Sequence, residues 1–253
     1  MRAKSLKILD ILMPLVALGV ILALWGITAK AVGSELLFPS ISTTFSSLWG
    51  LLKSAEFYLS VGHTLLRSLL SFALAFAVGI LLAVLSALCR PIRKFLSPVV
   101  VIVRVIPTMS VILLALVWVS SYVSPILVAF VVICPLIYGG YLSAIDGVDR
   151  DLVDMCKIYK VGAWQRVKSL YLPCTALSLF DTVKSTLGLT VKLVIAAEVL
   201  AQTKDSIGLG MQLSKIYLDT PILLAWTIVA ILLGGALEGL IAILKKLYMS
   251  KKK

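Results

Sequence analysis

Charged, hydroxyl and small residues recur on one side of an apolar stretch in the C-terminal third of the sequence. At about 100° per helical residue, four of them fall within about 60° and a fifth about 40° further round; they are Asp181, Ser185, Gly188, Lys192 and Lys184. Because lipid penalises polar groups, we expect this stripe to face an aqueous cavity. Lys192 could bind an anion there or pair with an acid of a second copy of the chain. Equally, its long stem could carry the ammonium group to lipid headgroups.

A second candidate group surrounds a proline in another apolar stretch and consists of Arg104, Pro107, Thr108 and Ser110. Proline bends a helix and frees backbone groups, which the Thr108 or Ser110 hydroxyl could satisfy. Arg104 fits either a gate residue or an arginine that snorkels to water. Glu198 is a third candidate, which fits the lining of an aqueous cavity or else an acid at the membrane interface or within a helix bundle.

A polar segment between two apolar stretches predicts a short helix. Asp149 is a favourable N-cap, and Asp151 lies in the first turn, where the helix dipole favours acids. Lys157 and Lys160 come late in the helix, where the dipole favours cations. Gly162 suits the left-handed conformation that ends many helices.

The predicted short helix carries one apolar stripe. Leu152, Met155 and Tyr159 follow the spacing i, i+3, i+7, so they share a face. Such a helix fits a groove on a soluble partner. A helix lying on the inner membrane leaflet, held by its basic residues, fits the same pattern equally well.

The sequence offers no catalytic constellation. It contains no G-x-x-x-x-G-K-[ST] phosphate loop, so we expect no ATP hydrolysis by this chain. Its four cysteines form no C-x-x-C pair, and its only histidine, His63, has no nearby carboxylate or cysteine in the sequence. We therefore expect a non-enzyme with no catalytic residues, no metal site and no cofactor of its own.

The composition indicates a chain whose main solvent is lipid. Of 253 residues, 60% are hydrophobic and only 14% are charged, which is too little polar surface for a soluble domain of this size. The net charge of +12 is distributed between long apolar runs rather than on one basic face. This pattern argues against a nucleic-acid binder.

Six stretches have about the 20 apolar residues that a helix needs to cross a bilayer. They are residues 9–28, 65–88, 98–119, 125–143, 177–201 and 222–244. The first run is too long for a signal peptide, so we interpret it as an uncleaved span. Between the first two spans, residues 45–52 form an amphipathic stretch that we expect along the membrane surface.

These spans predict an all-α membrane protein with six transmembrane helices in a single domain. We divide residues 1–253 into an N-terminal span at about 9–28, a five-helix core at about 62–244 and, within it, a polar loop at about 144–175. Basic residues set the orientation, because cytoplasmic loops are rich in lysine and arginine. Sixteen lie on the side of the termini and the polar loop and five on the other side, so both termini should be cytoplasmic.

The polar loop resembles the EAA motif of ABC-importer permeases, the coupling helix that docks on the ATPase subunit. Asp154-Met-Cys-Lys stands where the family has an acidic residue, two small residues and often arginine, and Leu172-Pro173 stands where the motif ends in Leu-Pro. The resemblance implies an ATPase-coupling set, which consists of Asp151, Leu152, Asp154, Met155, Cys156, Lys157, Tyr159, Gly162, Leu172 and Pro173.

The resemblance is closest to sulfonate/taurine/nitrate-type permeases and covers nearly the whole chain. The matching pieces, in chain order, are Phe38-Pro-Ser, Thr64-Leu-Leu-Arg67, Arg104-Val-Ile-Pro107 with Trp118, Ala197-Glu198 and Gly208-Leu-Gly210. Two positions depart from the pattern. Lys160 replaces the EAA glycine, which suggests a coupling helix extended by about half a turn to Gly162, and Leu113 replaces a second proline, which suggests a straighter third span.

The resemblance implies a type I ABC-importer permease in the inner membrane of a bacterium. Its partners would be two ATPase subunits that bind ATP and Mg, a second permease copy, an extracytoplasmic solute-binding protein and membrane lipid. The solute would be small, with an organosulfonate, nitrate or a vitamin precursor as candidates. The alternative is a secondary transporter or channel without an ATPase, a class that often shows two similar halves; this sequence shows no such repeat.

Overall fold

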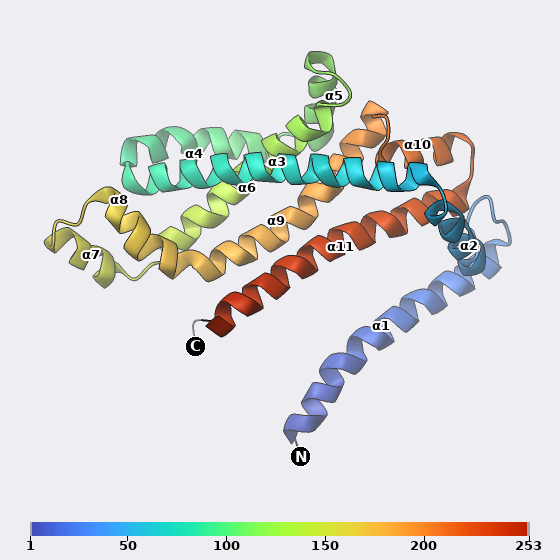
Figure 1. Ribbon diagram of the computed structural model, residues 1–253, viewed down its shortest axis with the longest axis horizontal. Coiled ribbons are helices and arrows are strands. Elements are labelled where there is room, and N and C mark those ends of the chain that lie inside the picture. The colour runs from blue at the N-terminus through green and yellow to red at the C-terminus, as the bar shows by residue number, and fades with distance from the viewer. Residues whose placement is uncertain (1, 252–253) are drawn as a thin grey trace. The chain divides into compact units, whose positions relative to one another are not determined.

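The computed structural model describes residues 2–251, with side-chain surroundings for residues 12–250. Every regular element in this range is helical, as expected for an all-α membrane protein (Figure 1). The elements are α1 (Arg2–Val32), α2 (Ile41–Leu52), α3 (Ala55–Leu88), α4 (Arg90–Val105), α5 (Thr108–Trp118), α6 (Ser124–Asp146), α7 (Arg150–Ile158), α8 (Ala163–Arg166), a π-helical turn (Val167–Tyr171), α9 (Leu172–Ala201), α10 (Ile207–Ile216) and α11 (Thr220–Lys251).

The chain divides into two compact units. The smaller unit contains the described residues up to Tyr58 together with Gly210–Ile228, and the larger contains Leu59–Leu209 together with the described residues from Val229 onward. Helices α3, α10 and α11 each contribute residues to both units. The candidate functional residues lie in the larger unit.

Local contacts in the smaller unit explain how its helices begin and end. Helix α1 is followed by Gly33, whose φ of 64° requires the left-handed conformation that glycine adopts without strain. The Ser40 hydroxyl caps α2 by accepting a hydrogen bond from the Thr43 backbone N–H at 3.2 Å. The Trp25 indole N–H donates to the Pro39 carbonyl at 3.0 Å, which fixes the loop between α1 and α2.

An aromatic contact joins the beginnings of α3 and α11 in the same unit. The rings of Phe57 and Trp226 stack with their centroids 5.5 Å apart. Gly210 of α10 leaves room for this packing, because a Cβ at that position would lie only 2.5 Å from the Trp226 ring. The unit is therefore held by aromatic packing and short loop contacts.

The core of the larger unit lies between α6 and α9, which run antiparallel and side by side (Figure 1). Apolar clusters fill this region. One is centred on Tyr138, Tyr141 and Ile145 near the end of α6, and another joins Ile133 and Ile137 of α6 to Val194 of α9. Gly79 of α3 permits close packing, since a Cβ there would meet Ile137 and the Cys134 carbonyl at 3.0 Å.

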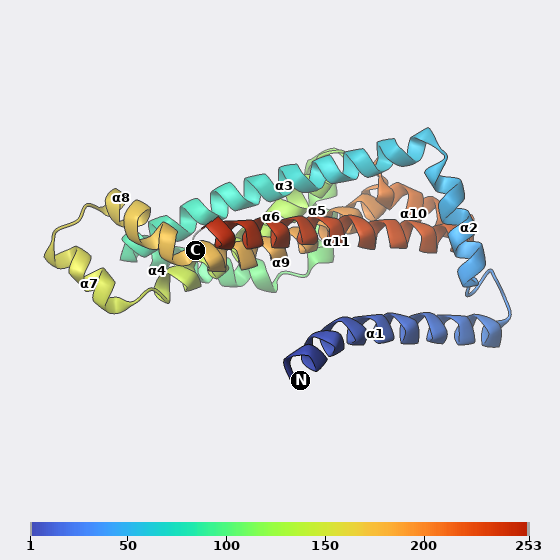
Figure 2. The same cartoon turned by 60° about the horizontal axis from the view of Figure 1, so that its bottom comes forward.

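Helix α11 lies along α9 within the larger unit (Figure 2). The Lys245 ammonium lies 2.6 Å from the Asp181 carboxylate, and the rings of Phe180 and Tyr248 are 5.5 Å apart. These contacts place the C-terminal half of α11 against the first half of α9. The polar stripe of α9 is therefore partly covered by α11.

Four helices in the described chain are long and apolar enough to cross a membrane, and a bent helix pair raises the number to five. The four are Leu12–Val32, Ala55–Leu88, Ser124–Asp146 and Thr220–Ser250, and the pair is α4 with α5. Helix α9 has 30 residues but carries Asp181, Lys184 and Lys192 along its length. It lies outside this group.

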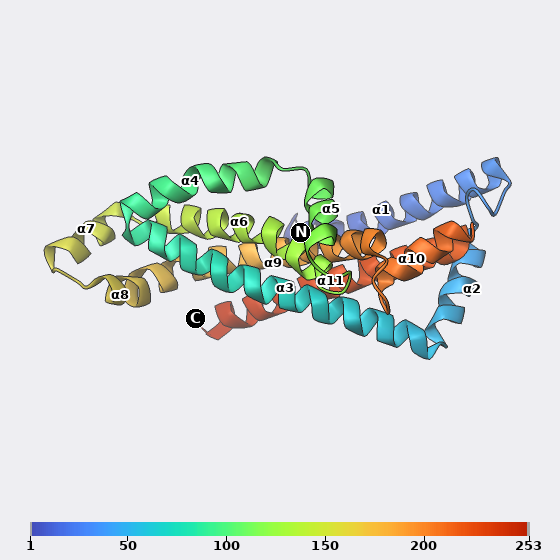
Figure 3. The same cartoon turned by 90° about the horizontal axis from the view of Figure 1, so that it is seen from above.

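The third predicted span is not one helix. Helices α4 and α5 are separated at Ile106 and Pro107 and bend by 96° (Figure 3). Pro107 has no N–H and disfavours helical backbone at the residue before it, which explains why α4 stops there. The bend expected at Pro107 is confirmed, and α5 continues without a break through Leu113, where the resemblance has a second proline.

Candidate functional site

The predicted short helix exists as α7 and begins as expected. The Asp149 side chain accepts a hydrogen bond from the Asp151 backbone N–H at 3.0 Å, and Asp151 lies in the first turn. Lys157 lies in the last turn, and its ammonium is 2.7 Å from the Asp154 carboxylate. The caps and charges that were visible in the sequence therefore define this helix.

Helix α7 has two different faces. Val153 and Cys156 pack against the apolar cluster near the end of α6. We predict that this end faces the cytoplasm. Leu152, Met155 and Tyr159 are exposed, and Tyr159 has 76% of its surface accessible. The helix is thus anchored on one side and presents an apolar stripe on the other.

Two exposed side chains extend this stripe and were missed in the sequence. Ile158 is the last residue of α7, and Trp164 belongs to α8. Both are highly exposed, although isoleucine and tryptophan usually bury most of their surface in a water-soluble loop. Large apolar residues in an otherwise polar loop indicate a binding surface, so Ile158 and Trp164 could have been identified from the sequence. We call Leu152, Met155, Ile158, Tyr159 and Trp164 the exposed α7–α8 patch.

The end of α7 corrects two expectations. The helix stops at Ile158, and Lys160 rather than Gly162 adopts the left-handed conformation, with φ of 52° against −59° for Gly162. The Val161 N–H bonds to the Cys156 carbonyl at 2.9 Å and the Lys160 N–H to the Lys157 carbonyl at 3.0 Å, which is a Schellman ending. The helix is not extended by half a turn. The position where the resemblance expects glycine is the one that needs a positive φ.

The last two residues of the predicted coupling set open the next helix. Leu172 and Pro173 form the start of α9, directly after the π-helical turn, and both are exposed. Proline fits the first turn of a helix because its missing N–H would have no partner there. Gly162, before α8, is also exposed.

The polar stripe of α9 is only partly accessible. Lys184, Ser185 and Lys192 are exposed, whereas Gly188 is buried. A Cβ at Gly188 would lie 1.9 Å from a Glu238 carboxylate oxygen, so this glycine makes room for the acid of α11. Glu238 thus joins the candidate residues through Gly188, a contact that the sequence did not indicate.

Glu198 is completely buried and belongs to a different cluster. One of its carboxylate oxygens lies 2.9 Å from the Arg67 guanidinium of α3, and the two side chains are 0% and 1% exposed. The Thr64 hydroxyl donates to the carboxylate at 2.9 Å, and the Gly208 N–H does so at 3.3 Å. Arg67 also lies over the Tyr122 ring, 4.5 Å from its centroid.

This cluster fixes the turn that follows α9. Arg67 donates to the Lys204 carbonyl at 3.2 Å, and the Ile207 N–H donates to the Thr64 hydroxyl at 3.1 Å. Thr64 and Arg67 come from one short motif, but Glu198 lies 131 residues beyond Arg67. The spacing along the sequence therefore gave no indication that Glu198 contacts Thr64 and Arg67. We call Thr64, Arg67 and Glu198 the buried charge cluster.

Arg104 approaches α6 beside the break between α4 and α5. Its guanidinium donates to the Pro135 carbonyl at 2.6 Å, and a Cβ on Gly139 would lie 1.9 Å from the same group. Thr108 begins α5 and Ser110 is exposed. Within residues 12–250, no hydrogen bond involves the hydroxyl group of either residue, so the predicted side-chain compensation is not seen.

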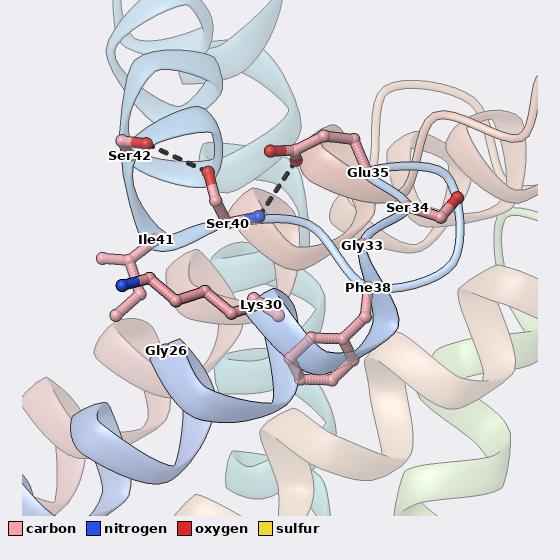
Figure 4. Close-up of a pocket in the computed structure, with 10 residues that line it drawn as sticks. Gly26, Lys30, Gly33, Ser34, Glu35, Phe38, Ser40, Ile41 and Ser42 are labelled. Carbon is pink, nitrogen blue, oxygen red and sulfur yellow. Dashed lines mark hydrogen bonds between the residues drawn. The ribbon is translucent and has the colours of Figure 1, made fainter.

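A pocket of about 620 Å³ lies in the smaller unit between the end of α1 and the start of α2 (Figure 4). Lys30, Glu35 and Ser40 contribute polar groups to it. The Glu35 carboxylate accepts a hydrogen bond from the Ser40 N–H at 2.9 Å, and this bond is the main cause of a lowered Glu35 pKa. No group of three metal-ligating side chains occurs in the part of the chain that the structure describes.

Solved structures share this fold at low sequence identity. The MetNI methionine ABC transporter in an inward-facing conformation matches with a TM-score of 0.60 and 20% identity, over 73% of this chain and 94% of that one. A bacterial ABC transporter that imports the acidic polysaccharide alginate matches with a TM-score of 0.65 and 17% identity, over 96% and 97% of the two chains. The fold is thus that of an ABC-importer permease.

Sequence comparison assigns the family. The putative aliphatic sulfonates transport permease protein of Bacillus subtilis (strain 168) is 20% identical over 229 residues, which are 90% of this chain and 83% of that protein. The family model described as "Binding-protein-dependent transport system inner membrane component" matches residues 76–248. The chain is therefore a multi-pass, non-catalytic permease component of a binding-protein-dependent ABC importer, and it belongs to the family of binding-protein-dependent transport system inner membrane components.

Proposed function

We propose that two copies of this chain form the translocation pathway of an importer whose ATP and Mg are bound by two partner ATPase subunits. An extracytoplasmic binding protein delivers the solute to the outer end of the pathway. Closure of the ATPase pair on ATP moves α7 of each permease copy and opens the pathway outward. Solved ABC transporters of the same fold, including one in complex with a periplasmic protein, support this arrangement.

Six membrane crossings with both termini in the cytoplasm are part of this proposal. The crossings are α1, α3, the bent pair α4 with α5, α6, α9 and α11. Helix α9 is included because 30 residues exceed the length that a bilayer requires and its charges lie on one side. Basic residues concentrate at α7 and at the termini, although Lys252 and Lys253 lie outside the described residues.

The exposed α7–α8 patch is the observation that carries the docking proposal. Its side chains are apolar and accessible, while Val153 and Cys156 fix an adjacent side of α7 to the core. An apolar helix face on a rigid base fits a hydrophobic groove of a soluble subunit. Tyrosine and tryptophan are also the residue types that dominate binding energy at interfaces.

The solute that we propose is a small anion. Lys184 and Lys192 are exposed on α9, on the side where Ser185 also lies, and an ammonium group inside a membrane pathway attracts negative charge. The relative in Bacillus subtilis is named as a permease for aliphatic sulfonates, which are anions. Snorkelling of Lys192 to lipid headgroups remains the competing interpretation.

Replacing Tyr159 or Leu152 with Asp tests the docking role. A buried carboxylate in the groove has no partner, so we expect ATPase association to weaken by about 2 kcal/mol or more, roughly 30-fold. The measurement is the amount of ATPase that copurifies with the tagged permease at equal expression. Unfolding is checked by size-exclusion profile and helical circular dichroism, which should not change because both positions are exposed.

Tyr217→Asp is the matched control. Tyr217 is 77% exposed, nearly equal to Tyr159, but it follows α10 and lies outside the α7–α8 patch. We expect this variant to retain the ATPase. Equal retention of the ATPase by Tyr159→Asp and Tyr217→Asp would show that α7 does not dock it.

A further inference from the structure

A polar pocket of about 710 Å³ lies behind α7, between the ends of α3 and α6 and the start of α4. Figure 3 shows these elements at one end of the larger unit. Val153, Ile145 and Tyr171 line its apolar part, and charged side chains line the rest. The pocket opens to the surface, and no group of three metal-ligating side chains occurs among the described residues.

The acids of this pocket already have partners. The Asp146 carboxylate is held by both terminal nitrogens of Arg93, at 2.9 and 2.6 Å. The Asp154 carboxylate is held by Lys157 at 2.7 Å. The negative charge of the pocket is therefore neutralised by cations next to it.

Two arginines remain without a partner. Arg90 and Arg150 both line the pocket, and no hydrogen bond or ion pair within residues 12–250 involves their guanidinium groups. Helix α4 starts at Arg90 with no side-chain cap and no acid in its first turn, so its N-terminal dipole adds positive potential. The pocket thus carries an excess of positive charge with its acids already engaged.

An apolar surface continues from this positive pocket. Pro98, Val101 and Val105 lie within about 80° of Arg90 around α4, and all three are exposed. A charged site at the foot of an exposed apolar helix face fits a molecule with an anionic head and a hydrocarbon tail. A soluble anion would use the arginines but not this face.

The ATPase-docking side of α7 does not block the pocket. Arg150, Val153 and Lys157 line the pocket at spacing i, i+3, i+7. The Leu152 and Tyr159 positions lie about 100° to 180° from these three residues around the helix. A ligand in the pocket would therefore support α7 from behind while the ATPase holds its other face.

We propose that Arg90 and Arg150 form a binding site for the phosphate of an anionic phospholipid headgroup, with the acyl chains along α4. Arginine pairs with phosphate in a planar, two-pronged geometry, and basic pockets between membrane helices on the cytoplasmic side are suited to anionic headgroups. The site is separate from the pathway and from the docking patch. Its occupancy would set how firmly α7 is held when the ATPase moves.

The test measures the thermal unfolding of the purified full-length permease in neutral detergent during titration with phosphatidylglycerol. A ligand that binds only the folded state raises the midpoint. We expect phosphatidylglycerol to raise it and phosphatidylcholine not to. In Arg90→Gln with Arg150→Gln, the half-saturating concentration of phosphatidylglycerol should rise at least tenfold.

Matched variants keep the test decisive. Lys168→Gln with Lys246→Gln removes the same charge from two exposed positions outside the pocket, and it should titrate as the unaltered chain does. Arg90→Lys with Arg150→Lys keeps the charge without the planar fork and should lie between the two, which guards against misfolding of the glutamine variant.

Two outcomes would overturn the proposal. One is equal phosphatidylglycerol binding by the double glutamine variant and the control variant. The other is stabilisation by inorganic phosphate that equals that by phosphatidylglycerol and needs the same arginines, because the occupant would then be a soluble anion. Neither outcome depends on transport, so the proposed import function would be unaffected.

Discussion

The charged side chains at the two ends of the larger unit differ in their burial. The buried charge cluster holds Glu198 and Arg67 with 0% and 1% of their side chains exposed. At the other end, the Asp154–Lys157 and Asp146–Arg93 pairs are about half exposed. Water screens the two exposed ion pairs but not the buried charge cluster. The buried cluster is therefore stabilised by electrostatic attraction, whereas the end that contains α7 is stabilised mainly by the apolar contacts of α7.

This difference matches what each end has to do in our proposal. The buried charge cluster joins α3, α9 and the turn before α10, so we expect these elements to move together. Helix α7 has only Val153 and Cys156 as core contacts and leaves its other side free. In that proposal, a rigid end at the buried charge cluster and a loosely charged end at α7 allow force on α7 to move the helices without unfolding the larger unit.

The largest expected effect comes from breaking the buried charge cluster. Glu198→Leu leaves Arg67 buried without its counter-charge, which costs about 3–5 kcal/mol in comparable buried pairs. We expect a marked fall in the thermal unfolding midpoint of the purified permease. The double replacement Glu198→Leu with Arg67→Met should recover most of the loss, since a buried pair replaced by apolar residues is often neutral.

Asp146→Leu is the matched control at the exposed end. It removes one acid from the Arg93 pair, and exposed pairs contribute about 0.2–1 kcal/mol. Its unfolding midpoint should therefore stay close to that of the unaltered chain. Similar losses in Glu198→Leu and Asp146→Leu would contradict the contrast between the two ends.

A smaller effect, on solute uptake, is expected from the polar stripe of α9, which lies between the buried charge cluster and α7. Lys192→Met keeps an unbranched side chain that is one atom shorter and removes its charge. If Lys192 meets an anionic solute, uptake should fall at least tenfold, about 1.4 kcal/mol in the transport barrier, while assembly with the ATPase survives. The measurement is uptake into proteoliposomes with the binding protein and ATPase present.

Unchanged uptake by Lys192→Met would favour the snorkelling interpretation. Lys184→Met gives a comparison on the same helix, because Lys184 is also exposed but lies near the edge of the stripe. We expect its effect to be smaller than that of Lys192→Met. This order would place the solute along the stripe rather than at its edge.

Local signals predicted the helices well. Asp149 and Asp151 defined the start of α7, and the long apolar runs predicted the all-helical membrane class. The amphipathic stretch at residues 45–52 belongs to α2, which begins four residues earlier, at Ile41. These features depend on neighbouring residues along the chain, which is why the sequence was sufficient.

Features set by tertiary contacts could not be predicted in the same way. Pro107 indicated a bend, but the 96° angle depends on how α4 and α5 pack on α6. The partner of Glu198 is 131 residues away, and the room for Glu238 comes from Gly188 on another helix. Helix α10 was missed because its ten residues are too short to give a clear periodic pattern.

Our proposal places the buried charge cluster and α7 on opposite sides of the membrane. Thiol labelling tests this placement most directly. In a variant with its four native cysteines replaced by serine, a single cysteine is placed at Lys204, beside the buried charge cluster, or at Ile158, at the end of α7. Both positions are exposed. The chain is expressed without its ATPase so that neither position is covered.

We predict that an impermeant maleimide added to intact right-side-out cells labels Lys204→Cys, and that Ile158→Cys is labelled only after the membrane is opened. This result places α7 in the cytoplasm, where an ATPase can reach it. Labelling of Ile158→Cys in intact cells, with Lys204→Cys protected until lysis, would contradict the orientation and with it the docking role of α7.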